Sequence, residues 1–177
     1  TNIIKKFGYP VVIKPINEGS SVNVFICNKS NLKNRLKKLK IYREILVEEF
    51  ISGREIQGAI LGNIKLGAIE LKPKRKFYDY EAKYSSKAQT KHIIPVDITK
   101  RKFNELMDIS LKVHKLLGCK GVTRSDFKYY KNNFYLLETN TQPGMTKLSL
   151  VPEICLHKGI SFIKLIRLLL DDASTNK

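Results

Sequence analysis

The feature that most constrains the fold is a pair of apolar-rich segments late in the chain, residues 122–127 and 137–140. They are joined through residues 130–133, whose sequence Tyr-Lys-Asn-Asn is typical of a hairpin turn. A turn this short makes the flanking strands run antiparallel, side by side. We therefore predict a β-hairpin in which alternate side chains face opposite sides of a sheet.

Polar side chains gather on this predicted hairpin. Arg124 and Asp126 share one face of their strand, and Glu138 and Asn140 share a face of the other. The turn sets Asp126 roughly opposite Glu138. Two carboxylates and one amide oxygen then meet without a nearby imidazole or thiolate, which favours Mg²⁺ and, with it, ATP chemistry. The alternative is a surface hairpin with scattered charges, because an aspartate followed later by Glu-x-Asn is a loose pattern.

A second candidate site lies near the start of the chain, where a short strand containing Lys14 leads into a loop of small residues. Backbone N–H groups of Gly19, Ser20 and Ser21 are suited to cradle a phosphate, to which Lys14 would add a positive charge. The alternative is an ordinary turn beside an exposed lysine.

Acidic residues mark a third candidate site, after the predicted strand at residues 45–50. The peptide edge near Glu48 and Glu49 is suited to pair with a purine ring, and Glu55 is suited to accept hydrogen bonds from ribose hydroxyls. The alternative is that these three are solvated charges on strands.

The pattern along the chain predicts an α+β protein with largely antiparallel sheets and no Walker motif. Leu117, Phe162 and Ile163 are expected to face inward from their helices. Residues 73–95 show little apolar periodicity and predict a long loop, which in a compact domain is usually functional or disordered. Strands are expected at residues 11–14, 22–26, 45–50, 54–61 and 64–70, and helices after a Ser30 cap, at 100–117, at 152–159 and after a Ser161 cap.

The net charge of +17 raises the alternative of a basic nucleic-acid-binding module. Only seven of the 33 basic residues are arginine, the charge is spread over every segment, and no zinc-finger or RNP-type motif is present. We therefore expect no nucleic-acid partner, although a basic surface would attract ATP and carboxylate substrates.

Several features bear on where the chain works. It has no apolar run of the length a membrane span needs, and its first residues do not resemble a signal peptide. Three widely spaced cysteines, an odd number, favour reduced thiols in the cytoplasm. The chain begins without methionine, on what resembles the end of a helix, so we expect a longer protein whose N-terminal portion is not included.

Eight segments, in order, are similar to one known family: residues 12–15, 18–22, 47–50, 53–55, 77–84, 124–127, 137–146 and 149–152. Through them the chain resembles the ATP-grasp ligases, and within these the D-alanine–D-alanine ligase family, over residues 9–170. The tyrosine-rich segment 77–84 and Pro-Gly-Met-Thr at 143–146 are the most specific matches. Asn23 departs from the family, which often has glycine there.

The resemblance implies a role for each matching residue. Lys14 would contact the ATP phosphates, the backbone around Glu49 and Ile51 would hold adenine, and Glu55 the ribose. Tyr84 with Ser20 would latch a lid at residues 73–95. The implied cofactor-binding residues are Lys14, Ser21, Glu48, Glu49, Ile51 and Glu55; the catalytic residues Arg124, Gly144, Lys83, Ser20 and Tyr84; the substrate-binding residues Ser149 and Leu150; and the metal ligands Asp126, Glu138 and Asn140.

The resemblance also implies a fold and a reaction. Two lobes, residues 1–54 and 55–177, would clamp ATP between largely antiparallel sheets. The enzyme would join two D-alanines through an acylphosphate for peptidoglycan synthesis, with two Mg²⁺ ions, or Mn²⁺, and ATP as co-substrate. An N-terminal domain would help to bind the first D-alanine, so the chain by itself is expected to be inactive; a homodimer of the complete enzyme stays open. Another ATP-grasp carboxylate–amine ligase is the alternative.

Overall fold

The computed structural model describes residues 2–19, 21–72, 90–146 and 148–173. The chain forms two compact units. The first contains the described residues up to Ser52, and the second contains residues 53–72 and the described residues from Lys91 onward. Among the described residues, no helix combines the length and apolar character that crossing a bilayer requires.

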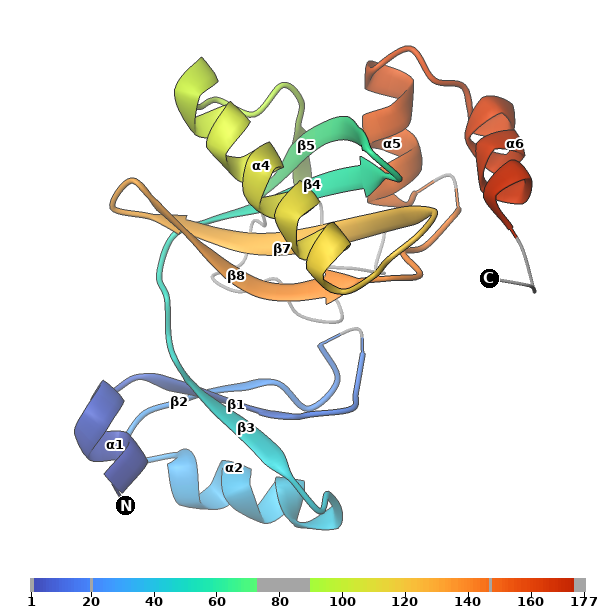
Figure 1. Ribbon diagram of the computed structural model, residues 1–177. Helices are drawn as coiled ribbons and strands as arrows, with labels where there is room; N and C mark the ends of the chain where they lie inside the picture. The colour runs from blue at the N-terminus through green and yellow to red at the C-terminus, as the bar shows by residue number, and fades with distance from the viewer. Residues whose placement is uncertain (1, 20, 73–89, 147, 174–177) are drawn as a thin grey trace. The chain divides into compact units, whose positions relative to one another are not determined.

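The first unit is a three-stranded antiparallel sheet with helices against one face (Figure 1). In β1, alternate residues such as Val11 and Ile13 are buried against Leu39 and Cys27, so Lys14 belongs to the opposite face. The elements are α1 (Asn2–Phe7), β1 (Val11–Pro15), β2 (Phe25–Cys27), α2 (Leu32–Lys38), the 3₁₀ turn η1 (Leu39–Ile41) and β3 (Ile45–Glu49), with strand order β2-β1-β3.

Two predictions for this unit are wrong in detail. The strand expected at 22–26 begins only at Phe25, because Ser21 (φ 61°) and Asn23 (φ 55°) adopt left-handed backbone that a strand cannot contain. Ser30 does not cap α2. The Oδ1 of Asn28 instead accepts hydrogen bonds from the backbone N–H groups of Ser30 and Asn31, both at 3.1 Å, and Asn31 is the residue before the helix.

The second unit is a five-stranded antiparallel sheet with strand order β6-β5-β4-β7-β8. The predicted pair of strands around residues 62–63 is present as β4 and β5. The elements are β4 (Arg54–Leu61), β5 (Ile64–Lys72), β6 (Lys91–Ile93), α4 (Lys100–Leu116), β7 (Val122–Tyr130), β8 (Asn133–Asn140), α5 (Leu150–His157) and α6 (Phe162–Asp172).

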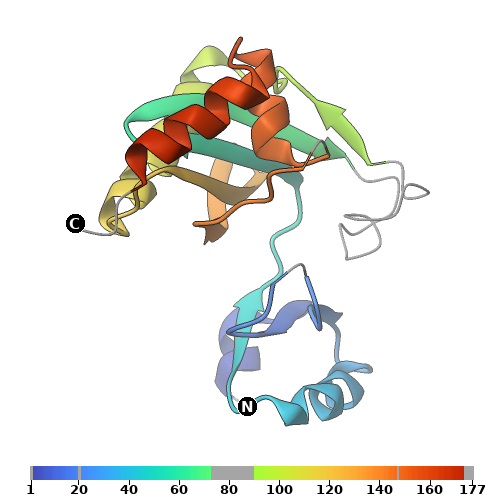
Figure 2. The same cartoon turned by 90° about the vertical axis from the view of Figure 1, so that its right-hand side faces the viewer.

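Helices α4 and α5 pack on opposite faces of this sheet (Figures 1 and 2). A Cβ atom added to Gly58 of β4 would lie 2.5 Å from Ser110 Oγ of α4, and one added to Gly67 of β5 would lie 3.2 Å from Ile154 Cγ2 of α5. Gly67 is paired with Ala59, the residue after Gly58, so the two glycines face opposite sides. The main apolar core lies under α4 and contains Ile56, Ile60, Ala68, Val96, Leu106, Met107 and Phe127.

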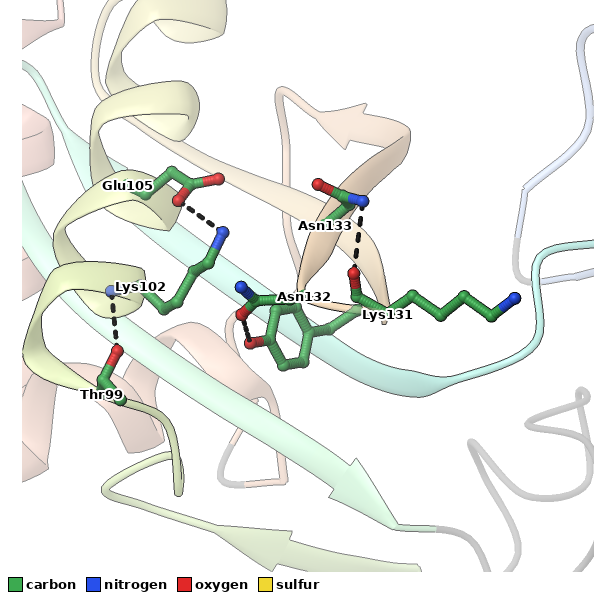
Figure 3. Close-up of polar contacts among 7 residues, drawn as sticks. Thr99, Lys102, Glu105, Lys131, Asn132 and Asn133 are labelled. Carbon is green, nitrogen blue, oxygen red and sulfur yellow. Dashed lines mark hydrogen bonds and ion pairs between the residues drawn. The ribbon is translucent and has the colours of Figure 1, made fainter.

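The predicted hairpin is present, and its turn is Lys131-Asn132. Both residues have positive φ, 46° and 65°, which is characteristic of the type I′ turn that matches strand twist. Figure 3 shows the Asn133 amide donating to the Lys131 carbonyl (3.3 Å) beside the first turn of α4, where Thr99 accepts from the Lys102 N–H (3.3 Å). The turn therefore fixes the register of residues 127–130 opposite residues 133–136.

Other expectations need correction. The predicted loop 73–95 contains strand β6, which pairs with β5; residues 73–89 lie outside the described part of the chain. Leu117 is exposed because α4 turns His114 and Met107 inward instead. In α6, Ser161 does cap the helix, but Leu165 is the buried residue, whereas Phe162 and Ile163 are 48% and 66% exposed.

Candidate active site

The sheet face opposite α4 carries two rows of polar side chains at neighbouring positions. In the first row, Gln57 of β4 is paired with Asp126 of β7, and Asp126 with Glu138 of β8. In the second row, Arg124 is paired with Asn140. The pairing of Asp126 with Glu138 is the register expected from the sequence, so that prediction is confirmed.

A bulge in the hairpin keeps this face polar. Asp126 is paired with Glu138, but the next residue, Phe127, is paired with Leu136, so Leu137 is an extra residue on β8. Such an insertion shifts the alternation of side chains by one residue and re-aims those near it. Bulges of this kind are common next to active sites.

The polar face is held together by ion pairs. Arg124 donates to both carboxylate oxygens of Asp126, at 2.7 and 2.9 Å, and the two side chains are 16% and 7% exposed. Lys128 pairs with Glu55 at 2.9 Å, and the amide of Gln57 lies 3.5 Å from the other Glu55 oxygen. Little solvent screens these pairs, so the contacts fix the orientation of both carboxylates.

The donor set fits Mg²⁺. Asp126, Glu138 and Asn140 offer only hard oxygen atoms, and Glu138 is exposed with no ion-pair partner among the residues that the structure describes. An ionised carboxylate accepts at about four positions, so the pair with Arg124 does not exclude a metal ion at Asp126. Within the described ranges no three His, Cys, Asp or Glu side chains form a metal cluster.

Two buried amide atoms on this face have no hydrogen-bond partner within the described part of the chain: Gln57 Oε1 and Asn140 Nδ2. A buried polar atom without a partner costs about 1–3 kcal/mol. Because the two atoms of an amide are exchanged by a flip, Asn140 can also present its oxygen from the buried position. Both amides therefore fit a site that a bound group completes.

A second group of predicted residues lies where the chain enters α5. The hydroxyl of Ser149 accepts from the Thr146 N–H at 2.9 Å, and its backbone N–H donates to the Thr146 carbonyl at 3.0 Å. A Cβ atom on Gly144 would lie 2.8 Å from Ser149 Oγ, so any larger residue there would displace the Ser149 hydroxyl. Leu150 is buried and is the first residue of α5. The N-terminal N–H groups of a helix are suited to a carboxylate.

The nucleotide residues predicted in the first unit are grouped in part. Lys14 pairs with Glu48 at 3.0 Å on the sheet face opposite the helices. The loop that follows β1 is tied down by Tyr42, whose hydroxyl accepts from the Asn23 amide (2.7 Å) and donates to Glu18 (3.0 Å). Asn23 tolerates its left-handed backbone, which explains how it replaces the family's glycine.

The other predicted residues are more scattered. Ser21 has positive φ in the same loop, Glu49 is exposed at the end of β3, and Ile51 is partly exposed. Ser20, Lys83 and Tyr84 lie outside the described residues, so their predicted roles stay predictions.

Neither buried cysteine, Cys27 or Cys155, matches a nucleophile. All three are free thiols, and burial raises the pKa of Cys155 to about 11 and also raises the pKa of Cys27. The buried thiols stay protonated at neutral pH and pack as small apolar groups.

Sequence reasoning missed three residues of the candidate site: Gln57 and Lys128 on the polar face, and Thr146 in the loop before α5. The first two have a sequence signal, since each lies two residues from a predicted site residue, Glu55 or Asp126, on a predicted strand. Thr146 has none, because its contact depends on the fold of a loop.

Comparison with known proteins gives one consistent result. A family model described as the D-ala D-ala ligase C-terminus matches residues 1–171. A D-alanine–D-alanine ligase of Pelagibacter ubique (strain HTCC1062) is 66% identical over 175 residues, which are 99% of this chain and 58% of that protein. The chain thus spans little more than half the length of this relative.

Solved structures agree with the sequence relatives. The crystal structure of a D-alanine–D-alanine ligase from Bacillus anthracis is matched with a TM-score of 0.84 at 31% identity, over 97% of this chain and 56% of that one. The structure of the Bacillus anthracis enzyme complexed with ATP gives a TM-score of 0.80 at 26% identity, over 96% and 54%. The chain has the α+β ATP-grasp fold, and it belongs to the D-alanine–D-alanine ligase family, whose C-terminus it matches.

Proposed function

We propose that this chain is the catalytic part of an ATP-dependent D-alanine–D-alanine ligase that serves peptidoglycan synthesis in the cytoplasm. The support is membership of the family, the 66% identity to a relative of that name, and the polar rows on the second unit's sheet. The proposed domains are residues 1–54 and 55–177, preceded in the working enzyme by a domain that binds the first D-alanine.

The proposed reaction has two steps. The carboxylate of the first D-alanine attacks the γ-phosphate of ATP, which forms an acylphosphate and releases ADP. The amine of the second D-alanine then attacks the acyl carbon, and phosphate leaves. The protein does little covalent work in such a reaction, so rate comes from positioning and from stabilising charge.

Asp126, Glu138 and Asn140 are the proposed ligands of Mg²⁺, two ions in all, with Mn²⁺ as a substitute. When bound, the metal neutralises charge on the phosphate oxygens. Arg124 orients Asp126 through its two hydrogen bonds, and it also supplies positive charge where an oxyanion develops. The observation that carries the proposal is that Asp126, Glu138, Asn140 and Arg124 lie at neighbouring positions on one sheet face.

Substrate contacts are proposed at the start of α5 and in the first unit. The Gly144 N–H stabilises the oxyanion, and Ser149 and Leu150 hold the carboxylate of the second D-alanine. Lys14 and Ser21 bind ATP phosphates, Glu48, Glu49 and Ile51 the adenine, and Glu55 the ribose. Lys83 is proposed to reach the γ-phosphate, and Tyr84 and Ser20 to close a lid that keeps the acylphosphate from water.

The test uses a fused enzyme: this chain preceded by the front part of the Pelagibacter ubique relative that the match leaves uncovered. We expect the fused enzyme to form D-alanyl-D-alanine and ADP in proportion, and only with Mg²⁺ or Mn²⁺. ATP turnover with other amine acceptors but not with D-alanine would instead favour a different carboxylate–amine ligase.

The 177-residue chain alone is the matched control. We expect it to make no dipeptide, because the first D-alanine lacks a defined attack geometry and orientation accounts for about 7–11 kcal/mol of such barriers. Dipeptide synthesis by the chain alone would contradict the proposed need for a preceding domain.

A further inference from the structure

One contact in the second unit has no part in the mechanism so far: His92 of β6 with Glu153 of α5. His92 Nδ1 lies 2.6 Å from Glu153 Oε2, and the side chains are 29% and 38% exposed. Because a carboxylate only accepts hydrogen bonds, the ring nitrogen facing it carries the hydrogen. The contact joins an edge strand of three residues to a helix on the sheet (Figure 2).

Glu153 lies in α5 close to the proposed site for a substrate carboxylate. It is the fourth residue of the helix, in its first turn, and its backbone N–H donates to the carbonyl of Ser149 at 3.4 Å. Side chains on a helix lean toward its N-terminus, so an unrestrained Glu153 carboxylate would extend over the first turn. That turn is where Ser149 and Leu150 are proposed to bind a substrate carboxylate, and two negative charges there would repel each other.

The sheet fixes His92 at the side of the helix. His92 is paired with Leu71 of β5, and Leu71 with Glu55 of β4, which places His92 on the face that α5 covers. On the same face, Ile154 of α5 packs against Gly67 of β5. The donor is therefore anchored beside α5 by backbone pairing.

We infer that His92 is a positioning residue: its hydrogen bond holds the Glu153 carboxylate against β6 and leaves the N-terminus of α5 open for the substrate carboxylate. This inference rests on the proposed function. If the pair only held α5 on the sheet, its loss would lower the free energy of unfolding and would change kcat and all the KM values together. If it restrains a competing charge, its loss raises the KM for the second D-alanine alone, and removing the charge reverses the effect.

The experiment measures both D-alanine KM values, the ATP KM and kcat of the fused enzyme and three variants. His92→Phe keeps a flat ring without the donor, and we expect the KM for the second D-alanine to rise about fivefold, as one charge at a helix terminus is worth about 1 kcal/mol. His92→Phe combined with Glu153→Gln should return that KM to its starting value. His92→Asn, which retains an N–H donor, should raise it less than His92→Phe.

The inference is overturned if His92→Phe leaves this KM unchanged, or if Glu153→Gln does not reverse the rise. An independent readout uses NMR titration of the 177-residue chain with D-alanine, following the amides of Leu150 and Val151. Weaker D-alanine binding by His92→Phe, with recovery in the double variant, would support the inference. This holds even if the fused enzyme forms no dipeptide, because that result would refute only the proposed function. Equal binding by all variants, or none, overturns it.

Discussion

On β7, Phe127 and Asp126 are neighbours in sequence and lie on opposite faces of the same sheet. Phe127 is fully buried under α4, where it meets the Phe134 ring edge-on at a centroid distance of 6.1 Å. Asp126 belongs to the row of Gln57 and Glu138, paired with Arg124. One strand thus builds the apolar core with one set of alternate residues and the candidate site with the other.

The comparison shows what each face requires. The face under α4 is stabilised by burial, which is non-directional and tolerates changes that preserve volume. The polar face depends on charge-assisted contacts such as the two between Arg124 and Asp126, which are directional. Substitutions on the first face should therefore change stability, and substitutions on the second should change activity.

The largest expected effect is on the polar face. We predict that Glu138→Gln lowers kcat of the fused enzyme about a thousandfold, since removing one preorganised electrostatic group costs about 100- to 1000-fold. Its free energy of unfolding should not change, because Glu138 is exposed. The control is Asp108→Asn, an exposed carboxylate on α4 that pairs with Lys65; it should leave kcat unchanged and cost at most about 1 kcal/mol of unfolding free energy. Near-normal turnover by Glu138→Gln at ordinary Mg²⁺ would refute the metal assignment.

Asp126→Asn should also abolish turnover, but we expect it to change stability as well, so it distinguishes the two faces less clearly. The new amide can still accept a hydrogen bond from Arg124, yet it removes the carboxylate charge that pairs with that mostly buried guanidinium. A fall in stability is expected beside the loss of activity. Thermal unfolding with and without the substitution measures that difference.

The next effect is on the apolar face. We predict that Phe127→Ala lowers the free energy of unfolding of the 177-residue chain by about 3–5 kcal/mol, because it removes a fully buried ring and leaves a cavity. Denaturant unfolding measures this value. Leu136→Ala is the control: Leu136 is paired with Phe127 but 43% exposed, so its loss should cost under about 1 kcal/mol. Equal losses in the two variants would contradict the division between the faces.

A smaller effect is expected where the chain enters α5. Gly144→Ala would place a methyl group 2.8 Å from Ser149 Oγ and push that hydroxyl away from the Thr146 N–H. We predict a loss of about tenfold to a hundredfold in kcat/KM, mainly through the KM for the second D-alanine, since small misplacements carry such costs. The free energy of unfolding should change little. A change in the ATP KM alone would show that this loop serves another substrate.

The sequence predicted the two faces well where a local rule applies. The predicted turn and strict alternation placed Asp126 only roughly opposite Glu138, because without the bulge this turn would pair Asp126 with Leu137. The same rules could not place the bulge at Leu137, because a bulge depends on both strands, nor the unpartnered oxygen of Gln57, because burial depends on the whole sheet. Helix faces were also hard to assign, as Phe162 and Ile163 show, because apolar residues occur on more than one side of α6.

His114 breaks the rule that the α4 face is apolar, and it yields the smallest predicted effect. It is 2% exposed, and its Nδ1 lies 2.9 Å from Thr123 Oγ1. Burial is the main cause that lowers the pKa of His114. The negative charge of Asp172 opposes this shift, and the positive charge of Lys115 adds to it. The unfolded chain, with histidine near its usual pKa of about 6.5, then binds a proton more readily than the folded one. Stability is therefore complete above that pH and falls as the pH drops below it, by at most about 1.4 kcal/mol per pH unit for one proton. We expect His114→Gln to flatten the curve of unfolding free energy below about pH 6.5. An unchanged slope would show that the pKa of His114 is the same in the folded and the unfolded chain.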